Sequence, residues 1–438
     1  MTGSLTQPRL RTFAHAAIVI AASALLTACG GGDGGGHSQS PPQISNFTFV
    51  PALLYVGSEL PFNGSFDFTD PNGDLASATL EILDSTGALL QSETIPISGV
   101  SGLKSGSIEG MVEGDTSTAG TFTVRVYVMD RAGLRSNTLS ASLRINEFPW
   151  VARTPMPLPR RDFATVVLNG KIYVLGGGDT TYPGYPKPAT DTVQVYDPAT
   201  DTWFVDYPML YPATDHVAAV VDGKIYVAGG YTQDMFPVKT LQVFDPSGFA
   251  IWARKADLPQ ERVDSAATGA GGILLVFGGR DPAMDSSIVF AYDPALDQWS
   301  TRAPMPDVRS KMAAIAVNGK SLILGGYGST YIPDGGYYRS MHQYDPDTNA
   351  WTQLTDMFTP RSDPAVALLG GKVYAGAGGN WDPALQDFAA YDPATNLWQP
   401  KTYLPQPLAW PRAEAVNGKM YVFDGNNTLE YTPANDIL

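Results

Sequence analysis

The chain has 438 residues, a formal net charge of −15, one cysteine and four histidines. Its 43 acidic residues outnumber the 28 basic ones, which argues against a nucleic-acid partner, because phosphate binding needs clustered Lys and Arg. One cysteine excludes disulfides within the chain. The 45 glycines, 35 prolines and 16% charged residues are typical of an all-β, turn-rich protein, and the length leaves room for two or three domains.

The first 43 residues have the features of an export signal followed by a tether. Arg9 and Arg11 precede an apolar stretch at 16–26, which is too short for a bilayer span of about 20 residues. The sequence Leu-Thr-Ala-Cys that follows resembles the bacterial lipobox, in which the cysteine is acylated and becomes the new N-terminus. We expect residues 1–28 to be a lipoprotein signal peptide, Cys29 to carry lipid, and residues 29–43 to form a flexible Gly/Ser/Pro tether.

The lipobox resemblance implies a place in the bacterial cell envelope, with the membrane bound through the N-terminal lipid. Gly30 follows the cysteine, and in that family a residue other than Asp at this position favours the outer membrane. An ordinary signal peptide cleaved nearby is the alternative.

Residues 44–147 show the alternation of apolar and polar residues that half-buried strands require, for example at 121–128. Turn clusters such as 70–74 and 131–133 separate these segments. Roughly seven short strands in this length predict a β-sandwich. The run 119–133 resembles the last strands of bacterial immunoglobulin-like domains, which implies an Ig-like domain acting as a spacer.

One group of side chains in this segment has the spacing of a calcium loop. Asp70, Asn72 and Asp74 alternate, and Glu81 is the twelfth residue counted from Asp70, so oxygen ligands for a hard cation recur along the chain. However, Leu75 stands where an EF-hand needs glycine, and a solvated turn is the alternative. Apart from calcium at these residues, we expect no cofactor.

A repeating unit of about 50 residues fills the remainder of the chain. Each unit has a glycine-rich step after an apolar run, and four units have a Tyr-Asp-Pro run seven residues before a tryptophan. Asn-Gly or Asp-Gly pairs, as at 169–170 and 417–418, predict type I′ hairpin turns. The tryptophans recur at intervals of 47 to 53 residues: Trp150, Trp203, Trp252, Trp299, Trp351 and Trp398.

These marks, recurring together in register, resemble the kelch repeat over about residues 150–433. The resemblance implies one four-stranded blade per repeat, and therefore an all-β protein with a six-bladed kelch-type β-propeller over 148–438, preceded by the Ig-like sandwich. Trp150 comes before the first Gly-Gly step, and no repeat tryptophan follows the sixth. We therefore expect the strand around Trp150 to complete the last blade, whose other strands come from 408–433.

A charged pattern stands at the entrance to the first strand of each unit, the strand that lines the channel in propellers. If residues two apart point the same way, one mouth of the channel carries a ring of aspartates, with arginines one step outward. Such a funnel would hydrogen-bond a ligand rich in hydroxyls or amides; salt bridges between blades or turn-capping arginines are the alternative. The residues are Arg160, Asp162, Asp215, Arg262, Asp264, Arg309, Arg361, Asp363 and, at the aspartate position of the sixth unit, Trp410.

The loops between the second and third strands carry aromatic residues outside the repeat core, among them Tyr185, Tyr331 and Trp381. We expect an aromatic rim that stacks on sugar rings or holds a peptide, because rigid aromatics on loops are common at binding surfaces. Packing of each loop against the next blade is the alternative.

Catalysis has little support in the sequence. Galactose oxidase, also a kelch propeller, holds copper through two histidines and tyrosines, one of them linked to a cysteine. Here the mature chain keeps His37, His216 and His342 and no free cysteine, so that chemistry is disfavoured. The sialic acid mutarotase is another propeller of this architecture. Mutarotation needs a carboxylate and a polarising partner, which Glu414 and Arg412 could supply.

The function that follows is a monomeric, non-catalytic binding module of the cell envelope, whose propeller funnel binds a glycan or a peptide or protein. A sugar-processing kelch enzyme of the mutarotase type is one alternative. A structural spacer or protein-interaction scaffold is the other.

Overall fold

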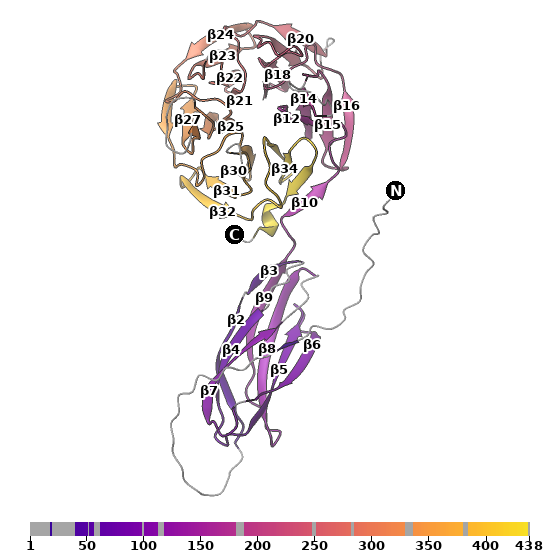
Figure 1. Ribbon diagram of the computed structural model, residues 1–438, viewed down its shortest axis with the longest axis vertical. Helices are drawn as coiled ribbons and strands as arrows, with labels where there is room; N and C mark the ends of the chain where they lie inside the picture. Colours follow the sequence, from indigo (N-terminus) through magenta and orange to yellow (C-terminus); the bar gives the residue numbers. More distant parts are fainter. Residues whose placement is uncertain are drawn as a thin grey trace. The chain divides into compact units, whose positions relative to one another are not determined.

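The computed structural model describes residues 18–19, 40–50, 52–56, 62–98, 100–112, 118–180, 188–247, 251–281, 284–328, 336–379 and 384–436. The chain divides into two compact units, residues 1–148 and 149–438, and both are built of strands (Figure 1). Within the described ranges, no helix has the length and apolar character needed to cross a membrane. Several residues singled out in the sequence lie outside these ranges: Cys29, Gly30, His37, Tyr185, Tyr331 and Trp381.

The first unit contains two sheets. One has the order β1-β7-β4-β2, and the other has the order β3-β9-β8-β5-β6. β3 and β9 run parallel, whereas the remaining pairs are antiparallel. β1 lies inside the predicted signal peptide and at the edge of its sheet, so the order β7-β4-β2 is independent of it. The strands are β1 (Ile18–Val19), β2 (Gln43–Val50), β3 (Leu53–Tyr55), β4 (Phe62–Thr69), β5 (Leu75–Leu83), β6 (Leu89–Pro96), β7 (Ser105–Val112), β8 (Gly120–Asp130) and β9 (Leu139–Asn146).

The core of this unit lies between its two sheets. Alternate residues of β8, Val124, Val126 and Val128, are buried, as the period of two in a half-buried strand requires. They pack in clusters with residues of the other sheet, including Phe66 and Ile108. The predicted alternation in this segment is therefore present, with eight strands between Gln43 and Asn146 rather than the seven expected.

The described residues of the second unit form six four-stranded antiparallel sheets. In sheets 1 to 5, the four strands lie side by side in the order in which they follow along the chain. Sheets 1 to 3 consist of β12 (Ala164–Leu168), β13 (Lys171–Leu175), β15 (Val193–Asp197) and β16 (Thr202–Asp206); β17 (Val217–Val221), β18 (Lys224–Ala228), β19 (Leu241–Phe244) and β20 (Trp252–Lys255); and β21 (Ala266–Ala270), β22 (Ile273–Phe277), β23 (Val289–Asp293) and β24 (Gln298–Arg302).

Sheets 4 to 6 follow the same plan, and the last strand of sheet 6 comes from the start of the unit. They consist of β25 (Ala313–Val317), β26 (Lys320–Leu324), β27 (Met341–Asp345) and β28 (Ala350–Gln353); β29 (Ala365–Leu369), β30 (Lys372–Gly376), β31 (Phe388–Asp392) and β32 (Leu397–Lys401); and β33 (Arg412–Val416), β34 (Lys419–Phe423), β35 (Thr428–Tyr431) and β10 (Trp150–Arg153). A short pair, β11 (Arg160–Arg161) with β14 (Gly178–Asp179), and a 3₁₀ turn, Pro433–Asn435, complete the described elements.

The six sheets close into a ring around a common centre (Figure 1). The first strand of each sheet, here called the inner strand, contacts the inner strand of the next, and β33 of sheet 6 contacts β12 of sheet 1. β10 pairs with β35 so that Trp150 lies opposite Tyr431. The two ends of the unit are thus joined within one sheet, at the place where the tryptophan spacing puts that strand.

The repeated tryptophans join neighbouring sheets. Each indole N–H donates a hydrogen bond to a backbone carbonyl just beyond the outer strand of the preceding sheet, so a half-buried polar group is satisfied at every junction. The pairs are Trp203 to Thr154 (2.9 Å), Trp252 to Tyr207 (3.1 Å), Trp299 to Ala256 (2.7 Å), Trp351 to Ala303 (3.1 Å), Trp398 to Thr355 (3.0 Å) and Trp150 to Thr402 (3.1 Å).

Candidate functional site

Six equivalent residues surround one opening of the ring. Each stands two residues before an inner strand, and each has a positive φ, between 47° and 56°. This conformation is uncommon outside glycine, although Asp and Asn adopt it more readily than most residues. We call them the mouth residues: Asp162, Asp215, Asp264, Lys311, Asp363 and Trp410.

Backbone hydrogen bonds connect successive mouth residues. The N–H of Asp215 donates to the carbonyl of Asp162 (2.9 Å), and the series continues through Asp264 (3.0 Å), Lys311 (2.8 Å) and Asp363 (2.7 Å). Because each residue donates to its predecessor in the neighbouring sheet, their side chains are brought around the same opening. The prediction that Asp162, Asp215, Asp264 and Asp363 stand at equivalent places around one mouth thus matches their arrangement.

The charges at the mouth are unevenly paired. Arg161 lies 3.3 Å from Asp162, Lys311 lies 3.9 Å from Asp264, and Arg412 lies 3.6 Å from Asp363. Among the described residues, no Lys, Arg or His nitrogen lies within 4.0 Å of the Asp215 carboxylate. That carboxylate accepts a hydrogen bond from the Thr214 hydroxyl at 3.3 Å.

Burial and mutual repulsion act on these carboxyls. Burial raises the pKa of Asp162 and of Asp264, and it raises the pKa of Asp215 well above its ordinary value, with the two flanking aspartates adding to the effect. For Lys311, burial opposes the charge, but the attraction of Asp264 and the other mouth carboxylates outweighs it and raises the pKa. The first three sheets thus present a carboxylate-rich arc with an unpaired centre at Asp215.

The prediction that arginines lie one step outward and contact a ligand is wrong. Arg160, Arg262, Arg309 and Arg361 are 1–6% exposed. The expectation assumed that residues two apart on a strand face the same way. However, the inner strand begins only after the mouth residue, and the positive φ there interrupts the extended backbone.

The buried arginines hold their own loops together instead. Arg309 donates to the carbonyl of Gly325 (3.0 Å) and to the hydroxyl of Ser340 (2.9 Å), and its guanidinium lies 4.2 Å from the centroid of the Tyr338 ring. Arg361 donates to the carbonyl of Ala377 at 2.8 Å. The turn-capping alternative therefore describes these two arginines.

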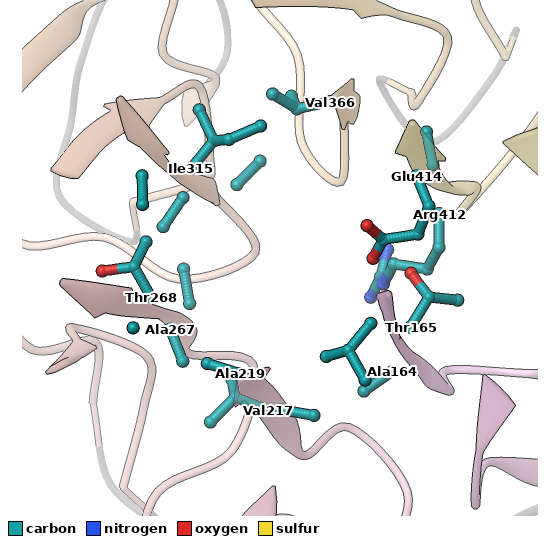
Figure 2. Close-up of a pocket in the computed structure, with 18 of the residues that line it drawn as sticks. Ala164, Thr165, Val217, Ala219, Ala267, Thr268, Ile315, Val366, Arg412 and Glu414 are labelled. Carbon is teal, nitrogen blue, oxygen red and sulfur yellow. The ribbon is translucent and has the colours of Figure 1, made fainter. Parts of the chain in front are cut away.

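Below the mouth, the inner strands enclose a cavity of about 540 Å³. Most of its wall is made of Ala, Val, Gly and Thr residues, but sheet 6 contributes Arg412 and Glu414. Figure 2 shows these two side chains with Thr165 on one side of the cavity, and Ile315 and Ala267 across from them. The two residues proposed from the sequence as a carboxylate and its polarising partner thus line the cavity.

Two ionisable groups in this wall have strongly shifted pKa values. Burial raises the pKa of Glu414 to about 7, against a lowering effect of the Thr165 hydroxyl. Burial, together with the charge of Arg412, lowers the pKa of His216 to about 4. His216 is therefore neutral at pH 7. It occupies the place that Phe163 and Met312 hold in other sheets, and it is buried in the cavity wall.

The described aromatic residues of these loops differ in how far they are exposed to solvent. Phe236 is 67% exposed, whereas Tyr337 is buried and Tyr338 lies against the Arg309 guanidinium. Tyr327 and Tyr337 form an edge-to-face pair with centroids 5.5 Å apart. In the described portion of these loops, most aromatic rings pack locally, and the predicted rim at Tyr185, Tyr331 and Trp381 stays a prediction.

The calcium residues of the first unit are occupied in another way. The Asp70 carboxylate is buried and accepts hydrogen bonds from the backbone N–H groups of Asn72 (3.2 Å) and Asp74 (2.8 Å). Glu81 lies on β5 opposite Arg125 of β8. Over the described ranges, no three His, Cys, Asp or Glu side chains gather in a way that could hold a metal ion. Asp70 thus stabilises its own turn here, and calcium at these residues stays a prediction.

Sequence reasoning did not find Thr165 or the unpaired state of Asp215. Thr165 could have been found by aligning the inner strands, because the equivalent residues are Ala218, Ala267, Ala314, Val366 and Ala413. No sequence signal distinguishes Asp215 from the other mouth aspartates, because its lack of a cation depends on where Arg161, Lys311 and Arg412 point.

Comparisons with known proteins agree with this architecture. Residues 215–425 match the model described as the KLHDC2/KLHL20/DRC7 Kelch-repeats domain, and residues 159–205 match the Kelch motif. Kelch-like protein 25 of Xenopus tropicalis is 30% identical over 237 residues, which cover 52% of this chain and 38% of that protein. Kelch-like protein terF of Aspergillus terreus is 31% identical over 241 residues, 52% of each chain.

Among solved structures, one titled "Structure of YjhT" has a TM-score of 0.48 and 18% identity, and covers 64% of this chain and 94% of that chain. The family matches and the curated relatives support a kelch-repeat protein. Its all-β, four-stranded sheets are consistent with a kelch β-propeller. The chain spans 38% and 52% of the length of the two curated relatives named above.

Proposed function

We propose that this chain is an envelope-anchored, non-catalytic binding module, in which a six-bladed kelch propeller holds a protein partner at its mouth. Kelch repeat domains typically serve as protein-interaction modules, which supports a protein ligand. The six four-stranded sheets among the described residues, and the contact of β33 with β12, support six blades. The two-sheet first unit supports an Ig-like spacer, and lipid at Cys29 supplies the anchor.

The observation that carries the protein-binding proposal is the unpaired carboxylate of Asp215. It stands between Asp162 and Asp264 with no cation within 4.0 Å among the described residues. Burial, together with repulsion by these two aspartates, raises its pKa. A Lys or Arg side chain of a partner, entering between these three carboxylates, would gain charge-assisted hydrogen bonds. It would also relieve the repulsion, so the mouth favours a partner with an exposed basic side chain.

A peptide array tests this proposal, with each sequence present in a lysine and a norleucine form at its central position. Wild-type protein should prefer the lysine forms. Asp215→Asn should weaken that binding about tenfold or more, since one charge-assisted hydrogen bond contributes about 1.5–3 kcal/mol.

The matched control is Asp222→Asn. Asp222 lies in the turn at the opposite end of its inner strand, and Asn occupies the same turn position in three other units, at Asn169, Asn318 and Asn417. The control removes the same charge and should leave peptide binding unchanged. Equal binding of lysine and norleucine forms, or binding to a glycan array without binding to peptides, would reject a basic protein partner.

The anchoring part of the proposal has its own test. In a bacterial host, the wild-type chain should incorporate labelled palmitate and sediment with membranes, and Cys29→Ser should abolish both. Label that persists in the serine variant, or that is absent from the wild type, would contradict lipidation at Cys29.

A further inference from the structure

The six junctions between inner strands are alike except at one place. At each junction, neighbouring inner strands contact each other, and two equivalent positions can be compared. One is the fourth residue after a mouth residue, and the other is the third residue after the next mouth residue, in the adjoining sheet. Five junctions pair small or apolar residues, or a threonine with an alanine, whereas the junction between sheets 6 and 1 pairs Glu414 with Thr165. The pairs are Val166/Ala218, Ala219/Ala267, Thr268/Ala314, Ile315/Val366, Ala367/Ala413 and Glu414/Thr165.

The fold itself does not require a carboxyl at this junction. Five equivalent junctions close with small or apolar side chains or with a threonine, and the hydroxyl of that threonine, Thr268, forms a hydrogen bond with Ser321 at 2.6 Å. Glu414 is half-buried, and a carboxyl removed from water without an ion partner is costly. Ionisable groups that break a local rule of the fold cluster at functional sites. Glu414 therefore points to a role beyond packing.

The charges of the cavity leave Glu414 uncompensated. Of the ionisable residues lining it, Arg412 lies 3.6 Å from Asp363, and His216 is neutral at pH 7. Over the described part of the chain, no cationic nitrogen lies within 4.0 Å of the Glu414 carboxylate. Asp363, which is 8% exposed, supplies a second acceptor. Its Oδ2 atom is buried and has no hydrogen-bond partner in the described structure.

We infer that the channel contains a second binding site, for a small organic amine, with Glu414 as the residue that receives the ammonium group. The cavity of about 540 Å³ falls within the range of roughly 300–1,000 Å³ that is typical of small-molecule sites. The wall opposite Glu414, which includes Ala267 and Ile315, is methyl-lined (Figure 2) and suits the alkyl part of such a molecule. Its polar side offers acceptors, Glu414 and Asp363, which match the N–H donors of an ammonium ion.

Calorimetric titration at pH 8 with three probes of similar shape tests the site. These are 1,5-diaminopentane, the uncharged 1,5-pentanediol and the anionic glutarate. The diamine should bind, and the diol and the anion should bind at least about tenfold more weakly, which corresponds to about 1.4 kcal/mol. Absence of heat with millimolar diamine, or equal binding of the diol, would overturn the inference.

Two variants assign the effect to Glu414. Glu414→Val installs the residue that Val166 provides at the same place in sheet 1, so the fold should tolerate it, and Glu414→Gln keeps the shape without the charge. Both should lose diamine binding by at least tenfold, while Asp222→Asn should retain it. Diamine binding that survives in both Glu414 variants would remove this residue from the site.

The same variants separate this site from the mouth. Glu414→Val should still capture lysine-containing peptides, and Asp215→Asn should still bind the diamine. If Glu414→Val lost the peptides while no small amine bound the wild type, the carboxylate would serve the partner's side chain, and the separate amine site would be refuted.

Discussion

Replacing Glu414 by Val should stabilise the propeller, and increasingly so as the pH rises. Glu414 and Val166 occupy the same register position, opposite Tyr421 and Tyr173 respectively, so Val fits without a new cavity. Burial raises the pKa of Glu414 from 4.5 to about 7. Between these two pKa values, the folded protein keeps a proton on Glu414 that the unfolded chain releases. The stability that this proton contributes is fully present below pH 4.5 and is lost as the pH rises through 7.

The size of this loss follows from the shift in pKa. One pKa unit corresponds to about 1.4 kcal/mol, so the shift from 4.5 to about 7 corresponds to about 3 kcal/mol of folding free energy. Solvent in the channel reduces this loss to about 2–3 kcal/mol. The stability advantage of Glu414→Val over the wild type should therefore grow by that amount between pH 5 and pH 8. Glu414→Gln should show the same pH dependence, since it also removes the titrating group.

Urea unfolding followed by tryptophan fluorescence measures this quantity in the propeller alone, because all eight tryptophans lie at or beyond Trp150. Asp162, Asp215 and Asp264 also have raised pKa values, but they are present in both proteins and largely cancel in the difference. Parallel stability curves for wild type and variant from pH 5 to pH 8 would refute the reasoning. A valine variant less stable than the wild type at pH 8 would do the same.

Three further changes probe the closure of the ring. Glu430 is 3% exposed and accepts two hydrogen bonds from Arg153 (2.8 and 3.0 Å), so Arg153→Ala should lower the free energy of unfolding by about 2 kcal/mol; urea unfolding that is unchanged would exclude a role in closure. Trp203→Phe keeps an aromatic side chain but removes one hydrogen bond between sheets, and should lower the free energy of unfolding by about 1 kcal/mol in the same assay. Gly425→Ala should cost about 3 kcal/mol or more, because φ is +92° and a Cβ would collide with the carbonyl of Arg160; a thermal melt like that of the wild type would contradict this.

Much of the propeller could be predicted from the sequence because its determinants are local and repeated. Asn-Gly pairs such as 169–170 adopt the positive φ values of a type I′ turn, and the apolar runs on either side form the strands they indicate. The strand at Trp150 was expected to complete the last sheet, because Trp150 precedes the first Gly-Gly step and no repeat tryptophan follows the sixth step. It does pair with β35 of that sheet. Each tryptophan marks a junction because its indole reaches the neighbouring sheet.

The buried arginines could not be placed in this way. Period-two alternation gives the direction of a side chain only while the backbone is extended, and the positive φ of Asp162 and its equivalents interrupts it. Which cation meets which mouth carboxylate depends likewise on side chains from separate sheets, such as Arg412 at Asp363.

The amino-acid sequence determined the strands, their order within each sheet, the turns and the residues that recur at each junction, because these depend on contacts within one repeat or between adjacent repeats. The tertiary structure decided which charges remain unpaired. The sequence singles out Asp215 and Glu414 as candidate site residues, but their lack of an ion partner arises only when ring closure sets their neighbours, since electrostatic energy depends on distances between groups far apart in the chain.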